Sequence, residues 1–161
     1  MDELLIGILS CSSACSLEGA EDVWGKRAAE ACRDAGHDVV AYHVCPDDAE
    51  CIEASLIEIV DVEEADVVLT VGGTGLAPSE VTPEVTEAVS TRLFPGVGEA
   101  IRAVTMEVDP RSAFSRGVAG QRGRTLIINL PACDETFDVA LAWVLERLPV
   151  VAQVIGGMSE G

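Results

Sequence analysis

A glycine-rich loop between an apolar strand and a helix start has a layout that can bind phosphate. Residues 67–71 are apolar or β-branched, which is typical of a buried strand. Gly72-Gly73-Thr74-Gly75 follows, where the backbone can take positive φ and a ligand can come close. Thr82 and Pro83 then predict a helix start, as its N-cap and its first residue. A strand, a glycine loop and a helix start together offer backbone N–H groups to a phosphate.

The glycine loop does not match two common nucleotide-binding motifs. The dinucleotide fingerprint needs G-x-G-x-x-G, and a P-loop needs Gly-Lys-Ser or Gly-Lys-Thr, whereas the only lysine of the chain is Lys26. Short glycine motifs also occur by chance, and a tight turn between strand and helix explains the same residues without a ligand. The layout alone leaves phosphate binding and a plain turn both open.

Five short motifs, taken as a set, resemble the MogA/MoaB family of molybdenum cofactor biosynthesis. They follow the order of the family at roughly its spacing and span nearly the whole chain. Each motif alone is common, and the set is specific. The motifs are Gly72-Gly73-Thr74-Gly75, Val81-Thr82-Pro83-Glu84, Pro95-Gly96-Val97-Gly98-Glu99, Ser115-Arg116 and Asn129-Leu130-Pro131.

The resemblance implies an activity. The family binds molybdopterin, and its adenylyltransferase members activate it with ATP, so we expect transfer of AMP from Mg-ATP to molybdopterin. Such a transfer needs a phosphate cradle, Mg²⁺ held by carboxylates and positive donors for the developing charge. By the resemblance, Asp47 and Glu80 are the catalytic and metal-binding carboxylates. The family usually has Asp at the second position, and the longer stem of Glu can displace a ligand by about an ångström.

The resemblance also implies the binding residues and the partners. The residues expected to bind the nucleotide are Glu99 and Arg102, whose i, i+3 spacing also permits a helix-surface ion pair worth about 0.3 kcal/mol. We expect a homotrimer, sometimes paired into a hexamer, and contacts with other proteins of the cofactor pathway. The residues expected to bind molybdopterin are Ser12, Gly72, Gly73, Thr74, Gly75, Ser115, Arg116, Pro131 and Ala132.

Ordinary structural roles also explain three of these residues. Asp47 and Glu50 have the D-x-x-E spacing of a capping box. Glu80 stands just before a helix start, where the helix dipole favours an acid. Arg116 can hold a phosphate with two hydrogen bonds or pair with one of the many surface acids.

Three loop positions depart from the family pattern. Trp24 stands where the family has a small residue, and it either fills part of the pocket or provides a new stacking surface. Ala132 replaces a glycine, which brings a β-carbon where close backbone contact or positive φ is expected. Asp134 replaces a proline and adds negative charge near an anionic substrate. These changes keep a second hypothesis open, a family member that binds a pterin or nucleotide without catalysing.

The chain alternates between strands and helices, which predicts the framework for these residues. Strands are expected at 4–9, 38–44, 67–71 and, after a hairpin turn at 122–124, 125–130. Helices are expected at 22–35, from 46, at 83–91, at 99–106 and from Asp134 to Pro149. The alternation predicts a three-layer α/β/α domain with a mostly parallel sheet, and the resemblance implies that this fold is MogA/MoaB-like. The loops expected to meet at its carboxyl edge are 10–19, 46–48, 72–80 and 131–134.

Length and composition fit one domain over residues 1–161, with 157–161 as a frayed tail. With 48% hydrophobic residues the chain can bury a core, and its apolar runs are shorter than the roughly 20 residues of a membrane span. A net charge of −18 argues against nucleic acid and anionic membranes as partners. The N-terminal residues lack the basic region of a signal peptide, so we expect a cytoplasmic protein.

The arginines and cysteines of the sequence bear on two further points, the charge near the substrate and a structural metal. An anionic substrate needs local positive charge, which Arg102, Arg111 and Arg116 near the loops would have to provide. The six cysteines form no C-x-x-C motif, and the two histidines supply no second half of a zinc site. We therefore expect no structural metal.

Overall fold

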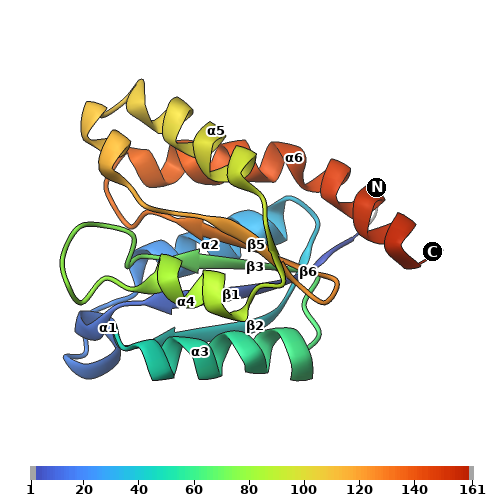
Figure 1. The fold of residues 1–161 in the computed structure, drawn as a ribbon, viewed down its shortest axis with the longest axis horizontal. Helices are drawn as coiled ribbons and strands as arrows, with labels where there is room; N and C mark the ends of the chain where they lie inside the picture. The colour runs from blue at the N-terminus through green and yellow to red at the C-terminus, as the bar shows by residue number, and fades with distance from the viewer. Residues whose placement is uncertain (1–2, 160–161) are drawn as a thin grey trace.

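The computed structural model describes residues 3–159 and contains a six-stranded sheet with helices on both faces (Figure 1). The strand order is β2-β1-β3-β6-β5-β4. The parallel strands are β2 (Asp38–Cys45), β1 (Leu5–Cys11), β3 (Val67–Val71) and β6 (Thr125–Leu130). Two antiparallel strands extend this sheet: β5 (Ala119–Arg122) pairs with β6, and β4 (Arg92–Leu93) pairs with β5. The predicted three-layer fold with a mostly parallel sheet is confirmed.

Two helical layers cover the sheet. One layer contains α2 (Val23–Asp34), α5 (Pro95–Met106) and α6 (Thr136–Ser159). The other contains α4 (Thr82–Val89) and α3 (Ala49–Ile57), which continues into a π-helical turn, Glu58–Val62. Two short helices lie in the loops, α1 (Ser13–Leu17) and the 3-10 helix η2 (Pro110–Phe114). Within residues 3–159, no helix combines the length and apolar character that crossing a membrane requires.

Each central strand packs against both layers, because successive side chains of a strand point to opposite faces. In β1, Ile6 and Ile8 pack in the core under α2 and α6, while Leu9 and Cys11 pack in the core under α3 and α4. Burial on both faces explains why this strand is apolar without alternation. The same burial holds the ends of the strands, and the loops that follow them, at defined positions.

Asn129 on β6 is a buried polar residue that connects three elements. Its amide nitrogen donates to the hydroxyl oxygens of Thr70 on β3 at 2.9 Å and of Thr86 on α4 at 3.0 Å. Its amide oxygen accepts from the N–H of Val118, just before β5, at 3.1 Å. Because buried polar groups are costly when unpaired, this residue fixes how α4 and the segment before β5 sit on the sheet.

Two helix starts differ from the sequence prediction. The N-cap of α4 is Val81 rather than Thr82, which is the first helical residue and is fully buried. The Thr82 side chain packs under the glycine loop, so its hydroxyl is not placed as a cap. The helix predicted from Glu99 begins at Pro95, because proline suits the first helical turn, where its missing N–H is not needed.

The last helix differs from the prediction at both ends. It begins at Thr136, past the predicted cap Asp134, and continues through Pro149 to Ser159. Leu148 and Ala152, on either side of Pro149, are buried in the same core, and their packing keeps the chain helical despite the hydrogen bond that proline removes. The tail expected at 157–161 therefore starts inside α6, and residues 160–161 lie outside the described residues.

We expect Asn129→Ala to lower the free energy of unfolding by about 3 kcal/mol, because it leaves the Thr70 and Thr86 hydroxyls and the Val118 N–H without their partner. Urea unfolding followed by circular dichroism measures the change. Thr91→Ala is the matched control, since it removes a hydrogen bond of an exposed hydroxyl that water can replace. A loss for Asn129→Ala as small as that for Thr91→Ala would contradict the role assigned to the buried amide.

Candidate functional site

The loops after β3 and β6 frame a hollow of about 670 Å³, called here the larger hollow. Its walls come from residues 72–75, from residues 131–134, and from η2 with the residues beside it. These loops leave the carboxyl ends of neighbouring parallel strands, where open α/β sheets bind their ligands. The predicted meeting of the glycine loop with the loop at 131–134 is confirmed.

A smaller hollow of about 250 Å³ lies beyond the end of β1. Its lining includes Ser12, Asp22 and Trp24. Ala132 lines both hollows, so they are neighbours that share part of a wall. Ser12, expected to bind molybdopterin, therefore lies at the smaller hollow, whereas Ser115 lies at the larger one.

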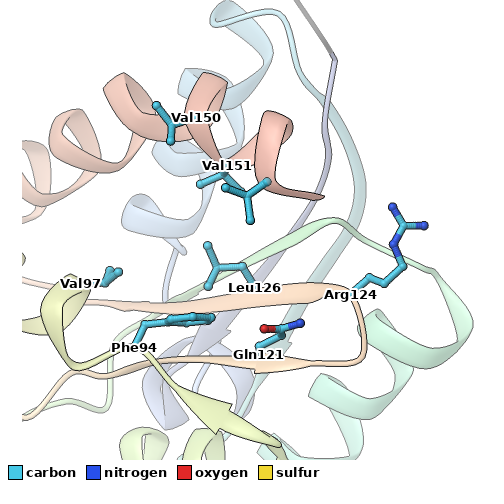
Figure 2. A pocket seen from close by; sticks show the side chains of 8 residues that line it. Phe94, Val97, Gln121, Arg124, Leu126, Val150 and Val151 are labelled. Carbon is cyan, nitrogen blue, oxygen red and sulfur yellow. The ribbon is translucent and has the colours of Figure 1, made fainter. Parts of the chain in front are cut away.

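A third hollow, of about 180 Å³, lies beside the β5–β6 hairpin and α6 and is mainly apolar (Figure 2). The described residues that line it include no carboxylate, hydroxyl or glycine, so it is not the place where phosphate chemistry is expected. The homotrimer expected from the family stays a prediction. The residues that line this hollow are Phe94, Val97, Gln121, Arg124, Leu126, Val150, Val151 and Val154.

The glycine loop requires glycine for two reasons. Gly72 and Gly73 have φ values of 94° and 72°, in the left-handed region that disfavours side chains. A β-carbon on Gly73 would also lie 2.2 Å from the hydroxyl oxygen of Thr82. Gly75 lies outside that region, but a β-carbon there would lie 2.5 Å from a carboxylate oxygen of Glu80. The loop therefore packs directly on Thr82 and Glu80.

The carboxylate of Glu80 closes the glycine loop. One of its oxygens accepts a hydrogen bond from the N–H of Gly75 and the other from the N–H of Ala77, both at 3.1 Å. Glu80 also lines the larger hollow, so the group that shapes the loop borders the ligand space as well. Its catalytic and metal-binding roles stay predictions.

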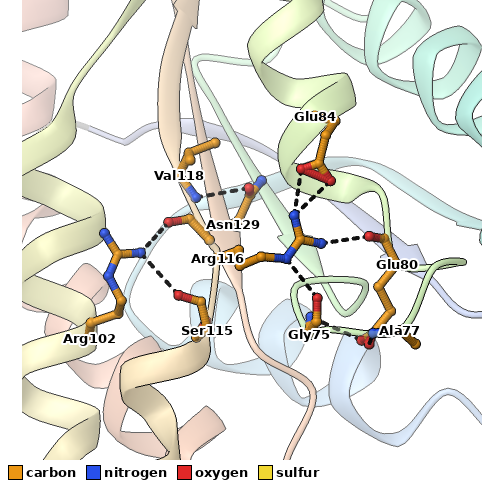
Figure 3. A network of polar contacts seen from close by, with 10 residues as sticks. Gly75, Ala77, Glu80, Glu84, Arg102, Ser115, Arg116, Val118 and Asn129 are labelled. Atoms are coloured by element: carbon orange, nitrogen blue, oxygen red, sulfur yellow. Dashed lines mark hydrogen bonds and ion pairs between the residues drawn. The ribbon is translucent and has the colours of Figure 1, made fainter.

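Arg116 holds the same loop through a second set of contacts (Figure 3). Its Nε donates to the carbonyl oxygen of Gly75 at 2.8 Å, and its Nη2 donates to that of Glu80 at 2.7 Å. Its Nη1 pairs with the Glu84 carboxylate at 2.6 Å. Its backbone N–H donates to the carbonyl oxygen of Thr74 at 2.9 Å. The guanidinium is thus engaged with the loop and α4, and its role in binding molybdopterin stays a prediction.

Arg102 and Arg111 have different surroundings. Arg102 on α5 donates to the carbonyl oxygens of Gly117 at 2.7 Å and of Ser115 at 3.4 Å, and so positions the segment after η2 (Figure 3). Arg111 on η2 lines the larger hollow, and its side chain is 89% exposed. It hydrogen-bonds to Asp109, which keeps the pKa of that carboxyl below its usual value. Among the three arginines named from the sequence, Arg111 is the one that borders the ligand space.

Asp47 also reaches the glycine loop. The N-cap of α3 is the next residue, Asp48, whose carboxylate accepts from the Cys51 N–H at 3.0 Å, and this bond keeps the pKa of Asp48 below its usual value. The capping box predicted at Asp47 is therefore wrong by one residue. Asp47 instead accepts from the Ser13 N–H at 3.1 Å and donates its own N–H to the Ser13 hydroxyl at 3.0 Å. Its Oδ1 lies 3.5 Å from the position of a β-carbon on Gly73.

The two carboxylates predicted to hold a metal therefore border different residues of the glycine loop, Asp47 at Gly73 and Glu80 at Gly75. Mg²⁺ is usually bound through one or two carboxylates together with substrate phosphates and water. Two carboxylates beside a loop suited to phosphate fit this pattern. Across residues 3–159, no group of three or more His, Cys, Asp or Glu side chains is arranged to hold a metal.

The same fold and motifs occur in known proteins. Residues 7–151 match the model of a family described as "Probable molybdopterin binding domain". The chain belongs to the MogA/MoaB family. The molybdopterin adenylyltransferase of Helicobacter pylori (strain J99) is 35% identical over 159 residues, which cover 98% of this chain and 90% of that protein. The crystal structure of the molybdopterin biosynthesis enzyme MoaB from Thermus thermophilus has a TM-score of 0.84 and 38% identity, covering 96% of this chain and 97% of that one.

A further relative matches over a shorter region. The molybdopterin adenylyltransferase of Escherichia coli (strain K12) is 44% identical over 99 residues, which cover 62% of this chain and 51% of that protein. The structure of a molybdopterin biosynthesis protein from Mycobacterium abscessus has a TM-score of 0.87 at 28% identity, and the match covers 98% of this chain and 97% of that one. The shared fold therefore extends over nearly the whole chain.

The departure at Ala132 does not place a non-glycine residue in the left-handed region. Ala132 lies outside the left-handed region, since the described non-glycine residues with positive φ are Glu64 and Glu135. Ala132 and Asp134 both line the larger hollow, as does Pro131. The strain expected at Ala132 is therefore not present, while the negative charge of Asp134 does border the ligand space.

Two predicted residues of the MogA/MoaB site, Glu99 and Arg102, lie on α5 apart from these loops, and Asp47, just before α3, is also not among the described residues that line either hollow. Glu99 is exposed on α5 and is not among the described residues that line either hollow. Its predicted role in nucleotide binding, like that of Arg102, stays a prediction. Of the wall that η2 contributes, sequence reasoning named Arg111 as a source of positive charge for an anionic substrate, but it assigned no role to Asp109 or Ser112, because no local motif shows that this turn lies at the hollow.

We expect Gly73→Ala to lower the free energy of unfolding by about 1–3 kcal/mol, because alanine is strained at this φ and its methyl group meets the Thr82 hydroxyl. Gly96→Ala is the control: it lies in the first turn of α5, where a β-carbon meets nothing within 4 Å, and should be neutral or stabilising by up to about 1 kcal/mol. Thermal unfolding of both variants measures the difference. Equal midpoints would show that the loop does not need its left-handed shape.

Proposed function

We propose that this protein transfers AMP from Mg-ATP to the phosphate of molybdopterin. The observation that carries the proposal is a glycine loop bordered by two carboxylates and facing a hollow of about 670 Å³. This volume falls in the range of about 300–1,000 Å³ that is usual for small-ligand sites. The likeness to the molybdopterin adenylyltransferase of Helicobacter pylori, 35% identical over 98% of this chain, supports the choice of reaction.

In the proposed reaction a phosphate oxygen of molybdopterin attacks the α-phosphorus of ATP. A new P–O–P linkage forms, the bond from the α-phosphorus to the bridging oxygen of the β-phosphate breaks, and pyrophosphate leaves. Transfers of this kind depend on positioning and on electrostatic stabilisation rather than on covalent chemistry by the protein. A loop held rigidly at both ends suits that task, because it needs no further ordering when a ligand binds. The N–H groups of Gly72 and Gly75 already donate to Leu130 and Glu80, so the N–H groups of Gly73 and Thr74 are the ones that would bind phosphate.

Each group of the site has its own role in the proposed reaction. The backbone of residues 72–75 cradles phosphate, and Asp47 and Glu80 would hold Mg²⁺. Bound there, the ion would offset the negative charge of the substrate phosphates. Arg111 supplies a cation at the wall of the hollow in a chain whose net charge is −18. Ser115, on the same wall, offers a hydroxyl group to the substrate.

The direct test is formation of adenylylated molybdopterin from molybdopterin and Mg-ATP labelled in the α-phosphate. We expect Asp47→Asn and Glu80→Gln each to slow product formation about a hundredfold, because each removes a charge beside the glycine loop. Asp48→Asn is the matched control for the first, since asparagine also caps a helix well. Glu87→Gln, on the exposed face of α4, is the control for the second.

The outcomes separate the two hypotheses. Product that forms with the wild type and both controls, fails in both acid variants and stops on chelation of Mg²⁺ with EDTA supports the transferase. A wild type that binds molybdopterin saturably without forming product is the non-catalytic pterin binder. Neither product nor binding would overturn the proposal.

Two exposed cysteines test where the substrates bind. Cys133 lines the larger hollow, and Cys51 lies on α3 away from it. We expect molybdopterin or Mg-ATP to slow alkylation of Cys133 by iodoacetamide at least severalfold and to leave the alkylation of Cys51 unchanged. Peptide mapping by mass spectrometry gives the two rates separately. Equal rates at Cys133 with and without saturating substrate would place the ligands elsewhere.

A further inference from the structure

The lining of the smaller hollow includes one aromatic side chain, that of Trp24, whose indole ring packs against two other side chains. The guanidinium carbon of Arg27 lies 4.9 Å from the centre of the indole ring. The ring of Phe137 lies 5.3 Å from it, tilted by 45°. Trp24 is partly buried against the core under α2 and α6, and it is also part of the lining of the hollow. An aromatic side chain that is already ordered loses little conformational entropy when a ligand stacks on it.

The backbone around Trp24 is also fixed. Asp22, the N-cap of α2, accepts hydrogen bonds from the Ser10 hydroxyl at 2.9 Å, from the Gly25 N–H at 3.2 Å and from the Tyr42 hydroxyl. A β-carbon on Gly25 would lie 2.1 Å from a carboxylate oxygen of Asp22, so this tight turn admits only glycine. Burial and the bond to Asp22 raise the pKa of Tyr42, so the phenol keeps its proton and keeps donating.

The polar groups of the smaller hollow suit the edge of a flat, amino-bearing ring. Both oxygens of Asp22 are engaged within the protein. The Glu21 carboxylate pairs with the exposed Lys26 at 3.5 Å and keeps its other oxygen for a ligand. The Ser12 hydroxyl accepts from the Cys15 N–H at 3.2 Å and can still donate. A carboxylate accepts from ring N–H and amino groups, and a hydroxyl can donate or accept. At about 250 Å³ this space is below the usual size of a complete ligand site, which fits one end of a ligand rather than the whole.

The smaller hollow lies next to the larger one, and this position indicates which kind of ligand would extend into it. Ala132 lines both hollows, so a molecule with its phosphate at the glycine loop can extend past Ala132 toward Trp24. Both substrates of the proposed reaction carry a phosphate at one end and a flat amino-bearing ring at the other.

We propose that Trp24 is a stacking wall for that ring, either the pterin of molybdopterin or the adenine of ATP. The inference rests on the proposed function for the identity of the two rings, and it adds a residue that sets which ring the site prefers. Stacking of a base on an aromatic side chain corresponds to a roughly tenfold to hundredfold change in affinity. Phenylalanine retains a stacking face and leucine does not.

The experiment measures the dissociation constants of Trp24→Phe and Trp24→Leu for molybdopterin alone and for Mg-ATP alone, by equilibrium dialysis. We expect Trp24→Leu to bind one of the two ligands roughly tenfold to hundredfold more weakly and Trp24→Phe to stay within a few fold of wild type. The ligand that weakens identifies the ring. Trp143→Leu is the matched control, because Trp143 is also partly buried and lies under an arginine, Arg147 at 4.2 Å, but lines neither hollow.

Fluorescence provides a readout that a purely structural role would not move. The chain has two tryptophans, so Trp143→Phe leaves Trp24 as the sole emitter and Trp24→Phe leaves Trp143. We expect saturating Mg-ATP or molybdopterin to quench the Trp24 emission more strongly than the Trp143 emission. Thermal unfolding of each variant shows whether the fold is intact.

Three results would overturn the stacking role: unchanged binding of both ligands by Trp24→Leu, equal losses for both ligands in Trp24→Leu and Trp143→Leu, or equal quenching of the two emitters. Product formation by the wild type is measured separately. If the wild type forms adenylylated product while Trp24→Leu binds both ligands normally, the stacking role fails and the proposed function stands. If the wild type forms no product but Trp24→Leu loses affinity for one ligand only, the stacking role stands without the transferase.

Discussion

The hydrogen bonds of one guanidinium, that of Arg116, set the shape of the glycine loop. The segment between β3 and α4 has no regular structure and few backbone hydrogen bonds of its own, such as that from the Thr82 N–H to the Gly73 carbonyl oxygen, so side chains supply most of its support. Arg116 donates to two of its carbonyl oxygens and pairs with Glu84 on the helix that follows. Hydrogen bonds from a charged donor are stronger than neutral ones, and a planar guanidinium also fixes direction. The loop can therefore keep its left-handed glycines and still be rigid.

Charged side chains around the candidate site mostly hold the backbone, and few cations border the ligand space. Arg102 and Arg116 bind backbone carbonyls, and Asp22 and Asp48 bind backbone N–H groups, so these ionic groups stabilise loops and helix ends. Glu80 serves the loop and the ligand space together. The loops of the site are thus held by charged side chains at their edges, while the strands beneath them are held by apolar packing.

The fold and the position of the loops could be predicted from the sequence, because β1 and β3 are short apolar runs and the glycines stand directly after β3. The details that failed depend on distant residues. Asp47 and Asp48 are both acids at the start of α3, and the choice between them follows from Ser13, 34 residues earlier, which holds Asp47. Apart from Arg111, the residues of the η2 wall were missed for the same reason, because their place at the hollow follows from the tertiary fold and not from a local pattern.

Ala132 has a consequence for the kind of molecule this protein can select. Its side chain is a single methyl group, and it forms part of the wall of both hollows. A molecule that occupies both has to pass this methyl group, so its span and its bend matter as much as the groups at its two ends. A larger residue here would divide the space into two short compartments, and glycine would widen the passage. Under the proposed function, the size of the side chain at position 132 would therefore limit the length of a molecule that the two hollows can hold together.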